Sequence, residues 1–97
     1  MKDASFYFFK GEEHRMRDEL KLAISYYEKA LQIDSEHEDS LFWIGYCYLD
    51  RTVNDIELDN TIRNERAVVA FQKLISILKK KGTLLQYRFN ILLLRFI

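Results

Sequence analysis

Hydrophobic residues recur at steps of three and four along most of this chain, a spacing that places side chains on one face of an α-helix. The cleanest example is the segment 19–33, whose opposite face is charged. Its apolar face is formed by Leu20, Ala23, Tyr27, Ala30 and Leu31. The chain has no proline and only three glycines, so little interrupts such helices. We therefore predict an all-α fold.

The same reasoning predicts four more helices, over 4–17, over 36–50, from the end of a loop at 51–64 to about residue 80, and over 83–97. The loop loses the helical period and gathers asparagine, aspartate and threonine. The helix over 36–50 is apolar almost all round, which is typical of a helix that is packed on two sides or offers a face to a partner. In the first helix, the apolar residues that share a face are Phe6, Phe9 and Met16.

Residues that cap helices mark where the predicted helices begin and end. Ser35 and Glu38 form an S-x-x-E capping box for the helix over 36–50. Gly82 follows three lysines, and we expect it to end the helix that precedes it. The candidate caps of the first and fourth helices are Asp3, Ser5, Asn60, Thr61 and Asn64.

Small residues recur along the chain at a fixed distance. Gly11 and Gly45 are 45 − 11 = 34 positions apart. Aligned on these glycines, two parts of the chain correspond at Ala23 with Ala67, Tyr27 with Phe71, Ala30 with Leu74 and Leu31 with Ile75, once ten extra residues are placed in the loop at 51–64. Glycine and alanine at matching positions let helix axes approach closely, so we expect two stacked helical hairpins.

This period and two motifs resemble the tetratricopeptide repeat (TPR) family, whose repeats span roughly 34 residues. The motifs are AISYYEKAL (23–31) and WIGYCY (43–48), which are similar to the family's A…Y…A pattern and its first-helix glycine and tyrosine. The loop insertion resembles Sel1-like repeats. The resemblance implies one domain, a right-handed stack of antiparallel helical hairpins, with repeat one at about 4–37, repeat two at about 38–81 and a terminal helix at 83–97.

Four positions depart from the family pattern. Lys10 and His14 stand where apolar or aromatic residues are usual, Ser35 replaces a proline, and Phe89 stands where a small residue is expected. Terminal repeats are often atypical in this way. The alternative interpretation is a helical bundle with alanine-rich faces and no repeat.

The charge balance narrows the class of partner. Fifteen basic and fifteen acidic residues give a net charge of zero, which argues against a nucleic-acid binder and against a coat on anionic membranes. No apolar run approaches the ~18 residues of a membrane span, and the apolar run at 6–9 is far shorter than a signal-peptide core. A single cysteine forms no internal disulfide, and we expect a cytoplasmic protein.

Three residues are candidates for metal binding or nucleophilic chemistry: His14, His37 and Cys47. They lack C-x-x-C or H-x-x-x-H spacing, and the chain has no glycine-rich phosphate loop. We expect His37 to lie in a solvated turn and Cys47 to be a small packed residue. The prediction is therefore no enzyme, no metal and no cofactor.

The resemblance to TPR proteins implies a concave groove that binds a peptide or a helical segment of a protein partner, which would make the chain an interaction scaffold. Carried over, the groove residues are Phe8, Phe9, Glu12, Phe42, Trp43, Tyr46, Leu49, Tyr87 and Asn90. Family members that bind acidic chaperone tails carry a cationic clamp, and its positions here are Phe8, Glu12, Trp43, Thr83 and Tyr87. With no cation there, a carboxylate gains nothing. The alternative is that Phe42, Trp43 and Tyr46 pack against the loop or the last helix.

A second hypothesis concerns the segment 83–97, which opens with a T-x-x-Q capping box and is apolar over most of its circumference. Its large apolar residues cannot all face inward: Leu84, Leu85, Leu92, Leu93, Phe96 and Ile97. We expect a homo-oligomer through this helix, as a self-associating structural unit without a separate ligand, or a fold that continues beyond residue 97. Membrane binding is disfavoured, because the polar seam has only two arginines.

Overall fold

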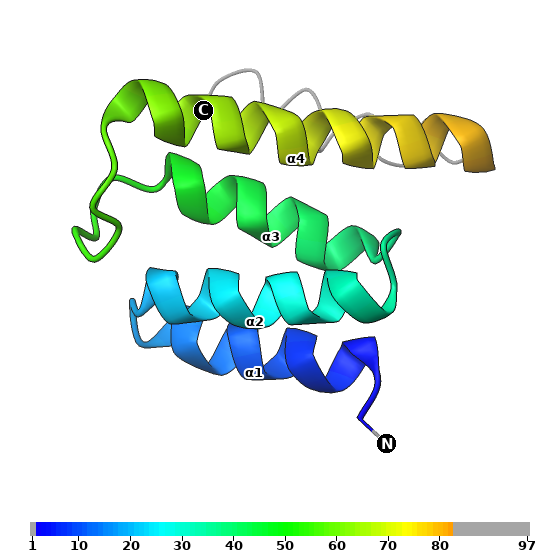
Figure 1. Cartoon of the computed structure of the whole chain (residues 1–97), viewed down its shortest axis with the longest axis horizontal. Helices are drawn as coiled ribbons and strands as arrows, with labels where there is room; N and C mark the ends of the chain where they lie inside the picture. The colour runs from blue at the N-terminus through cyan, green and yellow to red at the C-terminus, as the bar shows by residue number, and fades with distance from the viewer. Residues whose placement is uncertain (1, 83–97) are drawn as a thin grey trace.

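The computed structural model describes residues 2–82, which form four α-helices and no strand (Figure 1). The helices are α1 (Ala4–Met16), α2 (Leu20–Ile33), α3 (Glu38–Leu49) and α4 (Asn60–Lys81). The predicted all-α class is confirmed for this part of the chain. The fifth predicted helix, with the six residues proposed for self-association, lies outside the described residues.

Each helix packs against the next one along the chain, α1 on α2, α2 on α3 and α3 on α4. Successive helices run in alternating directions, so that α1 with α2 and α3 with α4 form two hairpins side by side (Figure 1). Short turns join the first three helices, whereas the segment 50–59 joins α3 to α4. The predicted loop was too long at its end, because α4 already begins at Asn60.

Each hairpin is held together by a glycine of its first helix that contacts an aromatic ring of its second helix. A Cβ atom at Gly11 would lie 2.6 Å from a ring carbon of Tyr27, and one at Gly45 would lie 2.6 Å from a ring carbon of Phe71. Ala23 and Ala67, the small residues predicted to allow close approach, are both buried. Gly11 corresponds to Gly45 in the sequence alignment, and Tyr27 corresponds to Phe71. The two hairpins therefore make the same kind of contact at corresponding positions.

The buried face of α1 differs from the prediction. Ala4, Phe8 and Gly11 face the core, whereas Phe9 and Met16 are 62% and 74% exposed. Four successive aromatic residues at 6–9 fit more than one helical face. The contact with α2 selects the face that carries Gly11, because only glycine leaves room for the Tyr27 ring.

Helix capping agrees with the sequence at the outer ends of the described chain. Asp3 caps α1 by accepting a hydrogen bond from the Phe6 N–H at 3.0 Å, as predicted. Gly82 ends α4 with a φ of 69°, in the left-handed region that glycine adopts without strain, also as predicted.

The caps of α3 and α4 correct the prediction. His37 caps α3, since its Nδ1 accepts from the Ser40 N–H at 3.3 Å, and Ser35 lies in the preceding turn. His37 thus lies at the end of the predicted turn, where it is partly buried and caps α3. Asp59 caps α4 by accepting from the Ile62 N–H at 3.0 Å, in place of the three predicted candidates. Spacing alone cannot choose among several adjacent polar residues.

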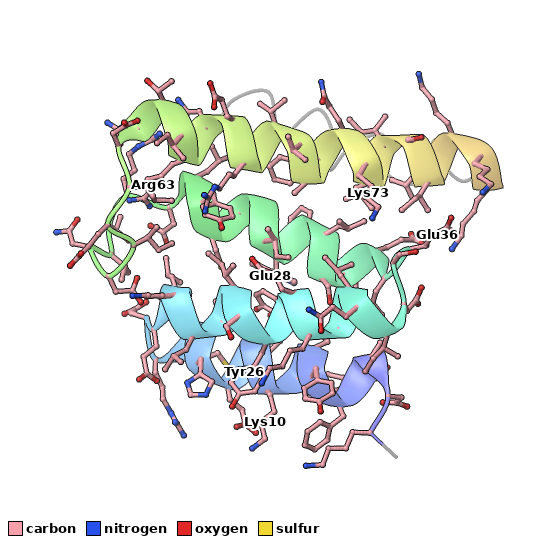
Figure 2. All side chains as sticks on the ribbon, in the orientation of Figure 1. Lys10, Tyr26, Glu28, Glu36, Arg63 and Lys73 are labelled. Atoms are coloured by element: carbon pink, nitrogen blue, oxygen red, sulfur yellow. The ribbon has the colours of Figure 1, made fainter. Side chains whose placement is uncertain are left out.

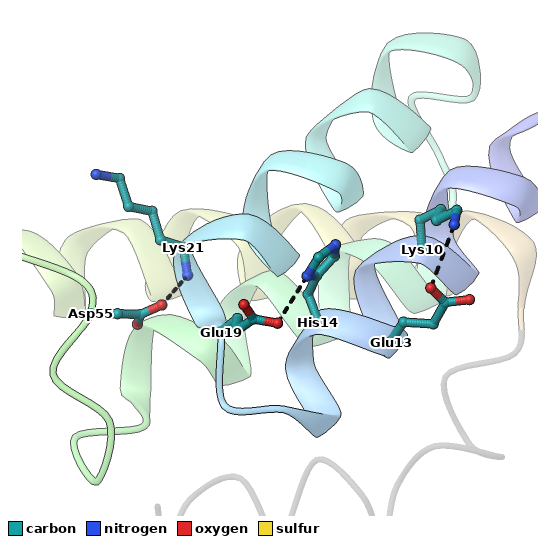
Figure 3. A network of polar contacts seen from close by, with 6 residues as sticks. All are labelled: Lys10, Glu13, His14, Glu19, Lys21 and Asp55. Carbon is teal, nitrogen blue, oxygen red and sulfur yellow. Dashed lines mark hydrogen bonds and ion pairs between the residues drawn. The ribbon is translucent and has the colours of Figure 1, made fainter.

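The segment 50–59 folds back onto the rest of the molecule. Asp55 accepts a hydrogen bond of 2.9 Å from the backbone N–H of Lys21 at the start of α2 (Figure 3), and Ile56 is buried in the core.

Arg63 of α4 is only 5% exposed. Its guanidinium donates to the backbone carbonyls of Tyr48, at 3.1 Å, and of Asp50. A side chain of α4 thus forms hydrogen bonds with backbone carbonyls at the C-terminal end of α3.

Replacement of Gly11 tests the close approach in the first hairpin. Alanine has the higher helix propensity, by up to ~1 kcal/mol, but its methyl group would collide with the fully buried Tyr27 ring. Since overpacking costs about 1–3 kcal/mol, we expect Gly11→Ala to lower the free energy of unfolding measured by urea titration. Ser25→Ala, at an exposed position of α2, is the control and should be neutral or slightly stabilising; a stabilised Gly11→Ala contradicts the packing.

Arg63→Met tests how much these hydrogen bonds at the C-terminal end of α3 stabilise the fold. Methionine retains much of the apolar volume but leaves two carbonyls without their donors, and hydrogen bonds from charged groups contribute about 1.5–3 kcal/mol. We expect a loss of roughly 2–3 kcal/mol in the free energy of unfolding. Arg51→Met is the matched control, because Arg51 is exposed and its hydrogen bonds go to the exposed side chains of Asn60 and Asn64. Equal effects of the two substitutions would contradict the role assigned to Arg63.

Candidate functional site

An arginine of α1 lies flat on a tryptophan of α3. The guanidinium carbon of Arg15 is 3.8 Å from the centroid of the Trp43 ring, a cation–π arrangement. Glu12 contacts Arg15 and Tyr46 contacts Trp43, and Phe9 and Met16 share the helix face of Glu12. We use the name aromatic surface for the set Phe9, Glu12, Arg15, Met16, Trp43 and Tyr46.

Glu12 holds Arg15 in this position. Arg15 donates to the two carboxylate oxygens of Glu12, from Nε at 3.0 Å and from Nη2 at 2.6 Å. The hydroxyl of Tyr27 donates to Oε1 of the same carboxylate. Bidentate arginine–carboxylate pairs fix orientation as well as adding stability. The contact of α2 with α1 through Tyr27 therefore helps to orient Arg15, whose guanidinium lies on the Trp43 ring.

The charges of this network shift the pKa values of its members. Burial raises the pKa of Glu12, but the hydrogen bonds from Arg15 and Tyr27 lower it more, so the carboxyl ends below its ordinary value. Burial, followed by the hydrogen bond to Glu12, raises the pKa of Tyr27. The hydrogen bond to Glu12 raises the pKa of Arg15. The ion pair therefore stays charged, and Tyr27 stays a donor, over the physiological pH range.

The aromatic residues of α3 contact one another at the edge of this network. The ring centroid of Trp43 lies 5.1 Å from that of Phe42 and 5.3 Å from that of Tyr46, both edge to face. Tyr46 is 38% exposed. Trp43 is half-buried and rests partly on the core. The tryptophan is thus a fixed platform, and Tyr46 is its accessible neighbour.

Apolar side chains of α1 extend this surface. Phe9, Glu12 and Met16 are spaced three and four residues apart, so they share one face of the helix. Phe9 and Met16 are largely exposed, as given above. Polar pairs lie beside them, with Lys10 Nζ 3.6 Å from Glu13 and His14 Nδ1 3.2 Å from Glu19 (Figure 3). Phe9 and Met16 thus form an exposed apolar strip with charged side chains beside it.

Of the set predicted to line a groove, Glu12, Trp43 and Tyr46 are connected through Arg15, and Phe9 is exposed on the helix face of Glu12. Phe8 is a correction, because its ring is buried, with centroids 5.7 Å from Tyr27 and 5.5 Å from His37. Phe42 packs on Phe71, with centroids 6.1 Å apart, and Leu49 packs on the core, so both are partly buried. Tyr87 and Asn90 lie outside the described residues, as do the clamp positions Thr83 and Tyr87.

Arg15 and Met16 were not predicted to belong to the site. Glu12 and Arg15 stand three apart on a helix, a spacing that favours an ion pair. That signal was available, but it does not show that the pair reaches a tryptophan 43 − 15 = 28 positions away. Met16 was placed with Phe6 and Phe9 on one apolar face of the first helix. It is exposed because the helix turns Phe8, and not Phe9, toward the core.

The groups considered for chemistry have other surroundings. Cys47 is fully buried, and burial raises its pKa to about 12, so its thiol stays protonated at neutral pH; the expected packed cysteine is confirmed. The His14 ring stacks on Tyr26, with centroids 5.2 Å apart. Within residues 2–82, no three histidine, cysteine or acidic side chains are grouped as metal ligands would be.

Comparisons with models of protein families, with curated proteins and with solved structures find no match to this chain. Among the described helices, none is both long and apolar enough to cross a bilayer.

Substitution of Glu12 tests the network by its dependence on pH. The pKa of Glu12 is lowered in the folded state, so its stabilisation is present above the unfolded pKa of ~4.3 and is lost as pH falls through the folded pKa. We expect Glu12→Gln to cost about 1–3 kcal/mol at pH 7, with a gap to wild type that narrows below about pH 4. Urea titrations between pH 3 and pH 7 measure this.

Glu13→Gln is the control for this experiment, because Glu13 is exposed and its ion pair with Lys10 is long, at 3.6 Å. Its free energy of unfolding should follow that of the wild type across the series. A Glu12→Gln protein as stable as wild type at pH 7, or a gap that persists unchanged to pH 3, contradicts the network.

Proposed function

We propose that this chain is a protein-interaction module that binds a peptide or a helical segment of a protein partner on the aromatic surface. The observation that carries the proposal is the platform formed by Arg15 on Trp43, with accessible Tyr46 beside it. Aromatic side chains bury large areas with little loss of conformational freedom and often dominate binding energy at interfaces. Here the platform is already ordered by the Glu12 ion pair, so binding does not have to order it.

The surface favours an apolar segment over an acidic tail. Arg15 is the cation of this surface among the described residues, and both oxygens of Glu12 already accept its hydrogen bonds. An incoming carboxylate would compete with an intramolecular partner that is held in place. The exposed groups left for contact, Phe9, Met16 and Tyr46, are mainly apolar. A helical partner segment with apolar residues at steps of three and four fits such a strip.

The fold is the second part of the proposal, that the hairpins are two TPR-like repeats stacked with a right-handed turn. Support comes from the equivalent glycine–ring contacts of Gly11 with Tyr27 and Gly45 with Phe71. Support comes also from the extra residues of the second hairpin, most of which fall in the connection 50–59 and the others at the start of α4. In such a stack α1 and α3 are the first helices of their repeats, and the aromatic surface lies on them.

A peptide selection tests the interaction. A displayed library of random 16-residue peptides, panned against the chain, is expected to yield peptides with apolar residues at helical spacing. Binding should change the emission of Trp43, the single tryptophan of the sequence. We expect Tyr46→Ser to weaken binding of a selected peptide by about tenfold or more, since interface anchors of this kind contribute at least ~1.4 kcal/mol. Fluorescence titration measures the dissociation constant.

Leu22→Ser is the matched control, because Leu22 is an exposed apolar residue of α2 outside this surface. It should bind selected peptides as the wild type does. Circular dichroism establishes that both variants keep their helices. The absence of enriched peptides, unchanged Trp43 emission on binding, or equal losses in the two variants would overturn the proposal.

A further inference from the structure

A second surface lies on α2, α3 and α4. A cleft of about 530 Å³ is open between α2 and α4, with Leu41, Ile44 and Tyr48 of α3 at its apolar floor. Glu28 on α2 and Lys73 on α4 stand on either side of it (Figure 2). Its lining shares no residue with the aromatic surface. Both surfaces can therefore be occupied at once, and this inference does not depend on the proposed function.

One stripe of α4 borders this cleft. Glu65, Val69 and Lys73 follow one another at steps of four and all line the cleft, so they share a face. Val69 is 65% exposed, and Val68 beside it is half exposed. Within residues 2–82, neither Glu65 nor Lys73 takes part in an ion pair. The stripe thus has an exposed apolar centre between two opposite charges, neither of which forms an ion pair within the described part of the chain.

The order of these residues is self-complementary. Glu65 precedes Val69 by four positions and Lys73 follows it by four. When two α4 helices lie antiparallel with Val69 facing Val69, Glu65 of each copy faces Lys73 of the other. A two-fold axis through this point makes both ion pairs at once, as isologous dimers do. We propose that a second copy of this chain docks on the stripe, as an antiparallel α4–α4 dimer.

The rest of the helix agrees with this register. Residues that face each other have numbers that sum to 2 × 69 = 138, so Arg66 would face Gln72, and acidic Asp59 would lie near Lys79. Arg66 is already occupied, since Nη1 lies 3.4 Å from the hydroxyl of Tyr48. None of these facing pairs joins like charges, and antiparallel helix dipoles attract. A parallel arrangement would instead place Glu65 beside Glu65 and Lys73 beside Lys73.

A charge-swap series tests this dimer. Glu65→Lys places lysines opposite each other, and Lys73→Glu does the same with glutamates, so each single variant should raise the dimer dissociation constant about tenfold or more. The double variant Glu65→Lys/Lys73→Glu restores both pairs and should return it to within about threefold of wild type. Within one copy the two residues are two turns apart, so such rescue reports contact between copies. Sedimentation equilibrium at low salt, where surface pairs are least screened, measures the constants.

Val69→Asp is a second variant, expected to prevent dimerisation by placing two carboxylates at the apolar centre. Lys29→Glu, an equal charge reversal on α2 outside the cleft, should leave the dimer unchanged. Circular dichroism verifies the helix content of every variant. A wild-type monomer at several hundred micromolar, or a dimer that the single variants leave intact, overturns the inference. So does a double variant no better than the singles, which would point to self-association through another part of the chain.

Discussion

The contact between Gly11 and the Tyr27 ring is the constraint on which the candidate site depends. A glycine lets α1 approach α2 until the ring of Tyr27 lies against its backbone. At that depth the Tyr27 hydroxyl reaches Glu12, and Glu12 in turn holds Arg15 over Trp43. Helix packing is thus coupled to the surface by a short series of contacts. A larger residue at Gly11 would disturb the platform without touching it.

The helix α3 carries both surfaces. Trp43 and Tyr46 face the side of α1, whereas Leu41, Ile44 and Tyr48 form the floor of the cleft between α2 and α4. This explains why its sequence is apolar almost all round, which predicted either packing on two sides or a face offered to a partner. Packing on two sides applies to much of its circumference, and Tyr46 remains exposed. Few of its residues are left for solvent, so changes in α3 affect packing and surface together.

Where the sequence predictions went wrong, several residues of the same kind stood close together. Four successive aromatics at 6–9 allowed Phe9 to be placed on the packed face as well as in the groove, and only contact with α2 puts Phe8 inside. The caps of α3 and α4 lie among clusters of polar residues, each able to accept the same bond. In such places local chemistry is degenerate, and the tertiary contact selects one solution.

The sequence alone determined the helical class, the four described helices to within a few residues, and the glycines and alanines at which they meet, because these follow from local spacing and side-chain size. Tertiary structure decided the contacts between distant residues. It placed Arg15 on Trp43, 28 positions away, Arg63 on the carbonyls that end α3, and Glu65 and Lys73 of α4 beside a cleft with an apolar floor. A hydrogen bond or ring contact requires an orientation defined to within ångströms, and periodicity along the chain specifies only which face a residue occupies.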